Sequence, residues 1–283
     1  MNPDYFIFGV ALFWVIFASI QDLKTREVAN WLSFSLIFLG LFYKLVYSLL
    51  TNQPDYFNYG AVSFLLFTAV AYAFYYGKVF AGGDAKLLMG LGAVIPGTAF
   101  REIALNGLLF IFALLFIGAI WSIIALFTPL VPLDKKIFWR EFSKYKKYYS
   151  YLVVFSLIIL AGAFYALPFS SALFVSIVFA LIILGYPLLK SADKSMTVIL
   201  PASKLTEGDW ILSDIKVGNK FVRKTVHGLS MKDIKLLREH GKKVSVKAGI
   251  PFVPAFLFAL LFMVSFWISG QSLASLIARL VQD

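Results

Sequence analysis

The sequence lacks cysteine altogether and contains only two histidines, His227 and His240. Thiol nucleophiles, disulfides and cysteine-based metal sites are therefore excluded, and a serine–histidine pair at membrane depth is disfavoured because both histidines lie in a polar segment. Charged residues are also scarce, at 14% of 283 residues, whereas hydrophobic residues make up 60%. Soluble domains have roughly 45–50% apolar residues even with glycine counted. The composition therefore excludes a soluble protein.

Long hydrophobic runs predict an all-α polytopic membrane protein with about eight transmembrane helices. A helix needs about 20 apolar residues to cross a bilayer, and most of the runs approach this length. The fourth run is short, glycine-rich and interrupted by Pro96, so we expect a partial or broken helix there. The predicted spans are 5–21, 31–50, 60–77, 85–99, 103–128, 150–167, 172–189 and 250–269.

Lysine and arginine are unevenly distributed between the connections of these spans. With eight spans, 23 of the 26 basic residues fall after the first, third, fifth and seventh span, when Lys86 at the start of the fourth span is counted with the connection before it. Short basic loops stay in the cytoplasm, so we predict that both termini lie outside and the basic connections inside. Most of the net charge of +11 then reflects the orientation of the protein in the membrane. The basic segments could also contact anionic lipid headgroups. Nothing in these loops indicates recognition of nucleic acid.

Residues 190–249 predict a small α+β cytoplasmic module that is inserted before the last helix. Apolar and polar residues alternate on both sides of Gly218-Asn219, which suits a hairpin turn between two strands. Ser230 then precedes a short helix that Gly241 would end, and a final short strand follows. The predicted domains are a membrane core at 1–189, the module at 190–249, and the last helix with the C-terminal tail at 250–283.

Two aspartates stand out because each lies at the cytoplasmic end of an apolar helix. Asp22 directly follows the first predicted span, and Asp84 lies between the third and fourth. Two carboxylates at the same depth can hydrolyse a peptide bond, because an ionised one activates water while a protonated one donates to the carbonyl oxygen. This chemistry needs no metal or cofactor. Each aspartate also has a structural interpretation, as a helix N-cap or an interfacial residue.

The residue types around Asp84 suit an active site for physical reasons. Gly82 and Gly83 allow a tight turn and the close approach of a substrate strand, because neither has a Cβ atom. Asp84 also stands at a predicted helix start, where the helix dipole favours the ionised carboxylate.

Two segments together resemble a known family. The segment AGGDAKLL, which contains Asp84 and Lys86, resembles the GxGD signature of intramembrane aspartyl proteases, in the form found in type IV prepilin peptidases and archaeal preflagellin peptidases. The segment DLKTREVANWL resembles the part of that family that bears the first aspartate. The chain departs from the pattern at Ala81, which replaces the first glycine, and at Ala29, where the family often has proline.

The resemblance implies that Asp22 and Asp84 form the catalytic pair, with Gly82, Gly83 and Lys86 as supporting motif residues. It implies an archaeal cell-membrane enzyme that cleaves the short basic leader of pilin-like or archaellin precursors on the cytoplasmic side. Bacterial relatives that also methylate the product carry an extra N-terminal loop with cysteine pairs, so we expect cleavage without methylation. The residues that bind the leader are not identified, although Glu27, Glu141 or the module's acids could meet its positive charges.

Three other functions are compatible with parts of the sequence. Presenilin-like proteases share GxGD, but their first aspartate follows tyrosine, whereas Asp22 follows Gln21, and the segment around Pro251 and Pro254 is only loosely similar to their Pro-Ala-Leu motif. A proton-coupled transporter would also place paired acids in a helix bundle, but it predicts acids near the membrane centre and repeated spans. A structural membrane scaffold is the third.

Overall fold

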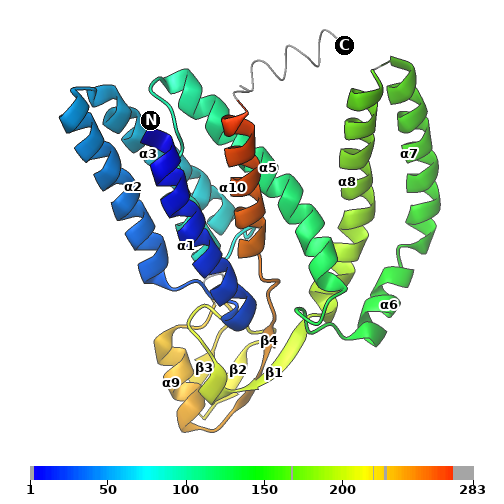
Figure 1. Ribbon diagram of the computed structural model, residues 1–283. Helices are drawn as coiled ribbons and strands as arrows, with labels where there is room; N and C mark the ends of the chain where they lie inside the picture. The colour runs from blue at the N-terminus through cyan, green and yellow to red at the C-terminus, as the bar shows by residue number, and fades with distance from the viewer. Residues whose placement is uncertain (1–2, 167, 219, 226–227, 270–283) are drawn as a thin grey trace. The chain divides into compact units, whose positions relative to one another are not determined.

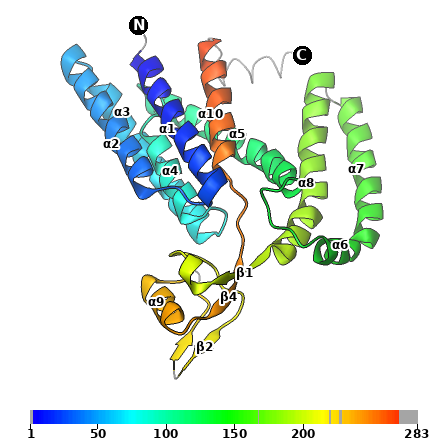
Figure 2. The ribbon, with the colours of Figure 1, turned by 60° about the horizontal axis from the view of Figure 1, so that its bottom comes forward.

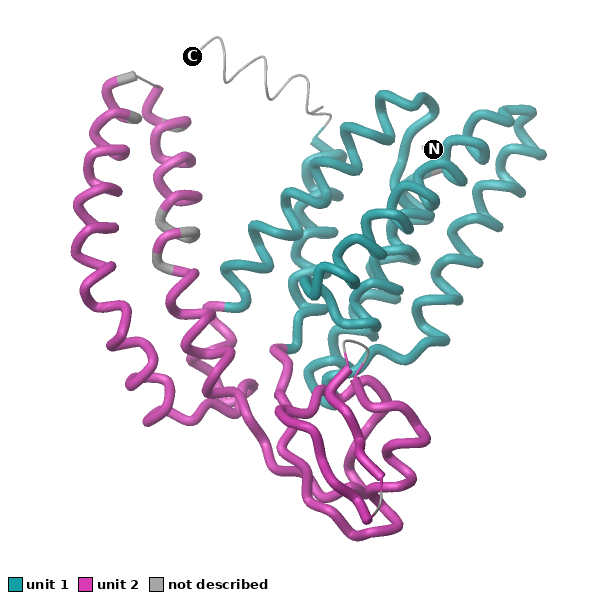
Figure 3. The backbone as a smooth tube through the Cα atoms, turned by 180° about the vertical axis from the view of Figure 1, so that it is seen from behind, with its two compact units in different colours: residues 1–122, 251–283 teal, residues 123–250 magenta. Residues whose placement is uncertain are grey.

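The computed structural model describes residues 3–166, 168–218, 220–225 and 228–269. The chain divides into two compact units (Figure 3), which comprise residues 1–122 with 251–283 and residues 123–250. The C-terminal helix therefore returns to the unit that is built from the N-terminal helices.

The first unit is a bundle of apolar helices (Figure 1). Helix α1 packs against α2 and α10, whereas the short helix α4 packs against α2 and α3. Its core is formed by buried aliphatic and aromatic side chains, which include Leu36, Leu88, Leu91, Phe110 and Phe256. The helices of this unit are α1 (Pro3–Thr25), α2 (Asn30–Thr51), α3 (Pro54–Tyr76), α4 (Gly82–Gly92), α5 (Phe100–Leu126), which continues into the second unit, and α10 (Val253–Ile268).

Within the described residues, four helices, α1, α2, α3 and α5, are long and apolar enough to cross a membrane. Helix α10 is apolar but has only 16 residues. Helix α4 has 11 residues, and at 1.5 Å per residue it is about 16 Å long, well short of the roughly 30 Å of a bilayer core. The predicted fourth span therefore ends as a helix at Gly92, before Pro96. Eight crossings remain a prediction.

The second unit contains a helical hairpin and the polar module (Figure 2). Strands β1 and β4 pair antiparallel, as do β2 and β3. The hairpin, the helix after Ser230 and the last strand are confirmed as β2–β3, α9 and β4, although Asn219 of the turn lies outside the described residues. The elements are α6 (Lys135–Ser143), α7 (Lys146–Ala166), α8 (Phe169–Ser195), β1 (Thr197–Pro201), a 3-10 turn (Ala202–Lys204), β2 (Ile215–Val217), β3 (Lys220–Val222), α9 (Met231–Glu239) and β4 (Lys243–Lys247).

Both ends of α9 follow from its sequence. The Ser230 hydroxyl accepts a hydrogen bond from the Asp233 backbone N–H at 3.3 Å, and the Asp233 carboxylate accepts the Ser230 N–H at 3.1 Å. This reciprocal pair satisfies two backbone donors at the helix start. Gly241, just past the end, has a φ of +57°, a conformation that glycine adopts without strain.

Glu141 joins two helices of the second unit. Its side chain is buried and accepts hydrogen bonds from Lys144 at 2.5 Å and from Lys194 of α8 at 2.8 Å. These hydrogen bonds lower the pKa of Glu141 to about 2. Because the carboxylate already has two lysine partners, Glu141 is poorly placed to bind a basic leader.

The Glu141 interactions predict a specific pH dependence of stability. A carboxyl group with a depressed folded-state pKa stabilises the fold above its unfolded value, and this contribution is lost as the pH falls toward the folded value. Glu141→Gln should therefore lower the melting temperature of the purified protein at pH 7. The difference from wild type should shrink as the pH falls from about 5 to 3. A difference that stays constant over this range would contradict this role of Glu141.

Candidate active site

Asp22 lies in the last turns of α1, not after the helix as predicted, because α1 continues to Thr25. Its side chain is buried, with 5% of its surface exposed. The Oδ2 atom accepts a hydrogen bond of 2.9 Å from the backbone N–H of Val253, the first residue of α10. A residue 231 positions away in the sequence therefore contacts the first predicted catalytic group.

Asp84 lies in the first turn of α4 and is partly buried. Its carboxylate accepts a hydrogen bond of 3.3 Å from the Ala81 backbone N–H, which is the arrangement of an acidic residue at a helix start. Burial raises the pKa of Asp84, and the charge of Asp22 raises it further. The two carboxyl groups are thus in the same unit and electrostatically coupled. The helix dipole, which favours the ionised carboxylate, is opposed at this position by burial and by the charge of Asp22.

The two motif glycines differ in what surrounds them. A Cβ atom on Gly83 would lie 3.3 Å from the Cβ of Val28 and 3.4 Å from its backbone nitrogen, so the start of α4 and the segment after α1 approach more closely than most side chains allow. A Cβ on Gly82 would meet only the Tyr75 ring, at 3.8 Å, which is ordinary contact. Ala81 has φ −72° and ψ 165°, an extended conformation that needs no glycine. The departure at Ala81 is therefore tolerated.

Lys86 connects α4 to the start of α2. Its ammonium group donates a hydrogen bond of 2.7 Å to the Asn30 side-chain oxygen. Ala29, just before α2, has a φ of −61°, which is close to the value that proline imposes. The Ala29 N–H donates to the Gln21 side chain at 3.2 Å, a bond that proline could not make. The departure at Ala29 thus keeps the backbone conformation and adds a contact to α1.

Both aspartates lie in a region that matches a known protein family. Residues 9–123 match the type IV leader peptidase family. The predicted family resemblance is confirmed over these residues. The chain is 35% identical over 89 residues to the preflagellin peptidase of Methanocaldococcus jannaschii, and 30% identical over 93 residues to that of Methanococcus voltae. These alignments cover 31% and 33% of this chain.

The similarity to these leader peptidases is partial. The chain spans about two fifths of the length of the curated relatives, 38% and 40% respectively. No solved structure matches it significantly. The leader peptidase region, residues 9–123, contains Asp22, Gly82, Gly83, Asp84 and Lys86 but not α10.

Sequence reasoning missed the start of α10 as a neighbour of the leader peptidase region. The contribution of Val253 is a backbone amide, and a backbone amide leaves no side-chain signature. The available signal was the segment around Pro251 and Pro254, which is loosely similar to a motif of presenilin-like proteases.

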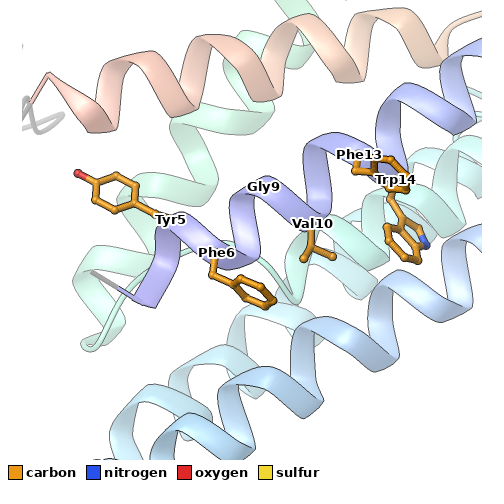
Figure 4. Close-up of a pocket in the computed structure, with 6 residues that line it drawn as sticks. All are labelled: Tyr5, Phe6, Gly9, Val10, Phe13 and Trp14. Carbon is orange, nitrogen blue, oxygen red and sulfur yellow. The ribbon is translucent and has the colours of Figure 1, made fainter. Parts of the chain in front are cut away.

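A shallow groove lies along the N-terminal half of α1 (Figure 4). It has a volume of about 390 Å³ and is lined mainly by apolar and aromatic side chains. Trp14, one of them, donates to the Ser35 hydroxyl at 2.8 Å. The groove contains none of the predicted site residues, so we assign it no part in the chemistry. Its lining residues are Tyr5, Phe6, Gly9, Val10, Phe13 and Trp14.

The two carboxyl groups are not part of a larger cluster of metal ligands within the described residues. No group of three or more His, Asp or Glu side chains in that part of the chain is arranged to hold a metal ion. The site as described consists of two carboxyl groups with backbone N–H donors.

Proposed function

We propose that the protein is an intramembrane aspartyl endopeptidase that removes the short basic leader of pilin-like or archaellin precursors. The observation that carries this proposal is that Asp22 and Asp84 lie in one compact unit and both within the region that matches leader peptidases. The names of the two archaeal relatives, both preflagellin peptidases, support the substrate class and an archaeal cell membrane as the location.

The chemistry follows from two carboxyl groups that share a site. One is ionised and takes a proton from water, and the hydroxide attacks the scissile carbonyl carbon. The other is protonated and donates to the carbonyl oxygen. Two close carboxyl groups cannot both ionise easily, so the pair carries one proton over a wide pH range. No metal or cofactor enters this scheme, and the absence of cysteine agrees with cleavage that is not followed by methylation.

Leader binding requires acidic groups that are accessible near the pair. Glu27 is exposed and lies five residues after Asp22. Glu141, in contrast, is held by Lys144 and Lys194. We therefore propose Glu27 as the better candidate of the two for contact with the basic leader.

The proposed orientation places both termini outside and the active site near the cytoplasmic face. It predicts that a cysteine at position 55 reacts with an impermeant thiol reagent added from outside, and that a cysteine at position 140 reacts only after the membrane is opened. Asp55→Cys and Arg140→Cys suit this test because both residues are exposed and the chain has no other thiol. The reverse pattern of labelling would contradict the orientation.

The function itself is tested by incubating purified protein in lipid with a precursor that carries a basic leader. A peptidase releases the leader, whereas a proton-coupled transporter leaves the precursor intact and moves a solute into vesicles along a proton gradient. Uptake that depends on Asp22 and Asp84, without cleavage, would overturn the proposal in favour of transport. A cut within the hydrophobic helix of the precursor, instead of just ahead of it, would contradict a leader peptidase.

A further inference from the structure

The two helices that carry the aspartates share a neighbour. Asp22 lies in α1 and Asp84 in α4, and α2 packs against both of these helices. The chain passes from α1 into α2 through residues 26–30, which we call the α1–α2 turn. This turn begins four residues after Asp22 and leads into the helix that supports α4. Its conformation therefore affects the positions of both carboxyl groups.

Two hydrogen bonds hold the α1–α2 turn to the end of α1. The Arg26 N–H donates to the Asp22 backbone carbonyl at 2.8 Å, and Arg26 has a φ of +59°, which is uncommon for a residue other than glycine. The Gln21 side-chain oxygen accepts the Ala29 N–H at 3.2 Å. Asp22 and the residue before it are thus both bonded to the turn. A left-handed residue persists where its surroundings determine the backbone conformation.

The start of α4 contacts the same turn. A Cβ atom on Gly83 would lie 3.3 Å from the Cβ of Val28, so the backbone just before Asp84 approaches the turn about as closely as glycine allows. Val28 itself is buried. Two residues after Asp84, the Lys86 ammonium donates to the Asn30 side-chain oxygen at 2.7 Å. The α1–α2 turn is therefore in contact with the neighbours of both aspartates.

We propose that Gln21 and Asn30 are positioning residues, which hold Asp22 and Asp84 at the separation that hydrolysis requires. This proposal rests on the proposed function and gives these two residues a part in it. Each acts through its amide oxygen, since Gln21 accepts the Ala29 N–H beside Asp22 and Asn30 accepts Lys86 beside Asp84. A displacement of about 1 Å in a catalytic group can lower a rate by about 100-fold, so contacts of this kind affect turnover.

A purely structural role for these hydrogen bonds predicts different kinetics. Loss of a structural contact lowers the amount of folded protein and leaves the turnover of the folded fraction unchanged. Loss of a positioning contact lowers kcat of the folded protein and leaves KM constant, because binding of the precursor does not require aligned carboxyl groups. A role of the same side chains in precursor binding would instead raise KM. Separate values of kcat and KM therefore distinguish the three roles.

The test measures kcat and KM for precursor cleavage by equal amounts of folded full-length protein in lipid. Asn30→Leu and Lys86→Met should each lower kcat by about 10–100-fold, with KM within about twofold of wild type. The double variant should be no slower than the slower single variant, because both substitutions remove the same hydrogen bond. Asn30→Asp keeps an oxygen acceptor for Lys86 and should restore most of the rate that Asn30→Leu loses.

A second variant tests the α1 side of the turn and serves if Asn30→Leu is not recovered in folded form. Gln21→Leu removes the acceptor of the Ala29 N–H and should also lower kcat with KM unchanged. The matched control is Ser35→Ala, which removes the acceptor of the Trp14 indole N–H at 2.8 Å. This hydrogen bond also joins α1 to α2 but lies outside the turn and both motifs, so the control should keep the wild-type kcat.

Several outcomes would overturn the proposal. These are an unchanged kcat in folded Asn30→Leu or Gln21→Leu, a rise in KM alone, or an equal loss of kcat in Ser35→Ala. Multiplicative effects of Asn30→Leu and Lys86→Met, or an Asn30→Asp variant as slow as Asn30→Leu, would also count against it. Failure of the proposed function is distinct, because then folded wild-type protein does not cleave or Asp22→Asn still does.

Discussion

Replacing either Asp22 or Asp84 with asparagine should reduce precursor cleavage by about 10²–10⁴-fold, the usual contribution of a general acid or base. Asparagine matches aspartate in size, and its side-chain oxygen can still accept the Val253 N–H or the Ala81 N–H that the carboxylates accept now. The fold should therefore survive while the proton transfer is lost. The measurement is the rate of leader release by equal amounts of folded protein.

Asp55→Asn is the matched control for this pair of variants. Asp55 is exposed in the first turn of α3 and far along the chain from both motifs, so its variant should cleave at the wild-type rate. Wild-type activity in Asp22→Asn or in Asp84→Asn would remove the aspartate pair from the mechanism. A moderate loss in all three variants would indicate an effect of charge on the protein as a whole and would also count against the pair.

Lys44→Met should destabilise the first unit by about 3–5 kcal/mol, the usual cost of breaking a buried charge network by removing one partner. Lys44 is fully buried within the α2 helix and donates to the Ile95 carbonyl at 2.6 Å. Its charge also faces buried Asp4, which accepts a hydrogen bond of 2.6 Å from Tyr56. Methionine keeps an unbranched apolar side chain that is only one atom shorter, so most of the lost stability comes from the charge and its hydrogen bond. The measurement is the free energy of unfolding in detergent, obtained from a denaturant titration.

Two further variants control the Lys44 experiment. Lys78→Met, at an exposed position of the same unit, should change the unfolding free energy by less than about 0.5 kcal/mol. The double variant Lys44→Met with Asp4→Asn should be more stable than the sum of the single effects predicts, because the variants share one network. Strict additivity of the two single effects would show that Lys44 and Asp4 do not interact.

Some elements could be predicted from the sequence because the physical signal is local. The predicted span 31–50 agrees with α2 to within one residue at each end, since polar residues flank a long and mainly apolar run. The first helix was predicted to end at residue 21, but it continues to Thr25, because polar residues at a membrane surface can remain helical. Strand β1 was not predicted, because its partner β4 lies more than 40 residues further along the chain.

The candidate site shows the same division between local and distant information. Asp84, its glycines and Lys86 form one contiguous motif, and Asp22 lies in a second, so the sequence identifies them directly. The hydrogen bond from Val253 depends on the return of the chain after the polar module, and no pattern near Asp22 indicates it. The hydrogen bond between Lys86 and Asn30 likewise depends on how α4 packs against α2.

Cleavage of a leader from a precursor by two aspartates is tested most directly by the masses of the products. A precursor is incubated with purified protein in lipid, with wild type and the Asp22→Asn/Asp84→Asn double variant side by side. We expect two products from wild type, a basic leader and a mature chain that begins at its hydrophobic helix, and intact precursor with the double variant. The same two products from the double variant, or intact precursor with folded wild-type protein, would contradict cleavage by this pair.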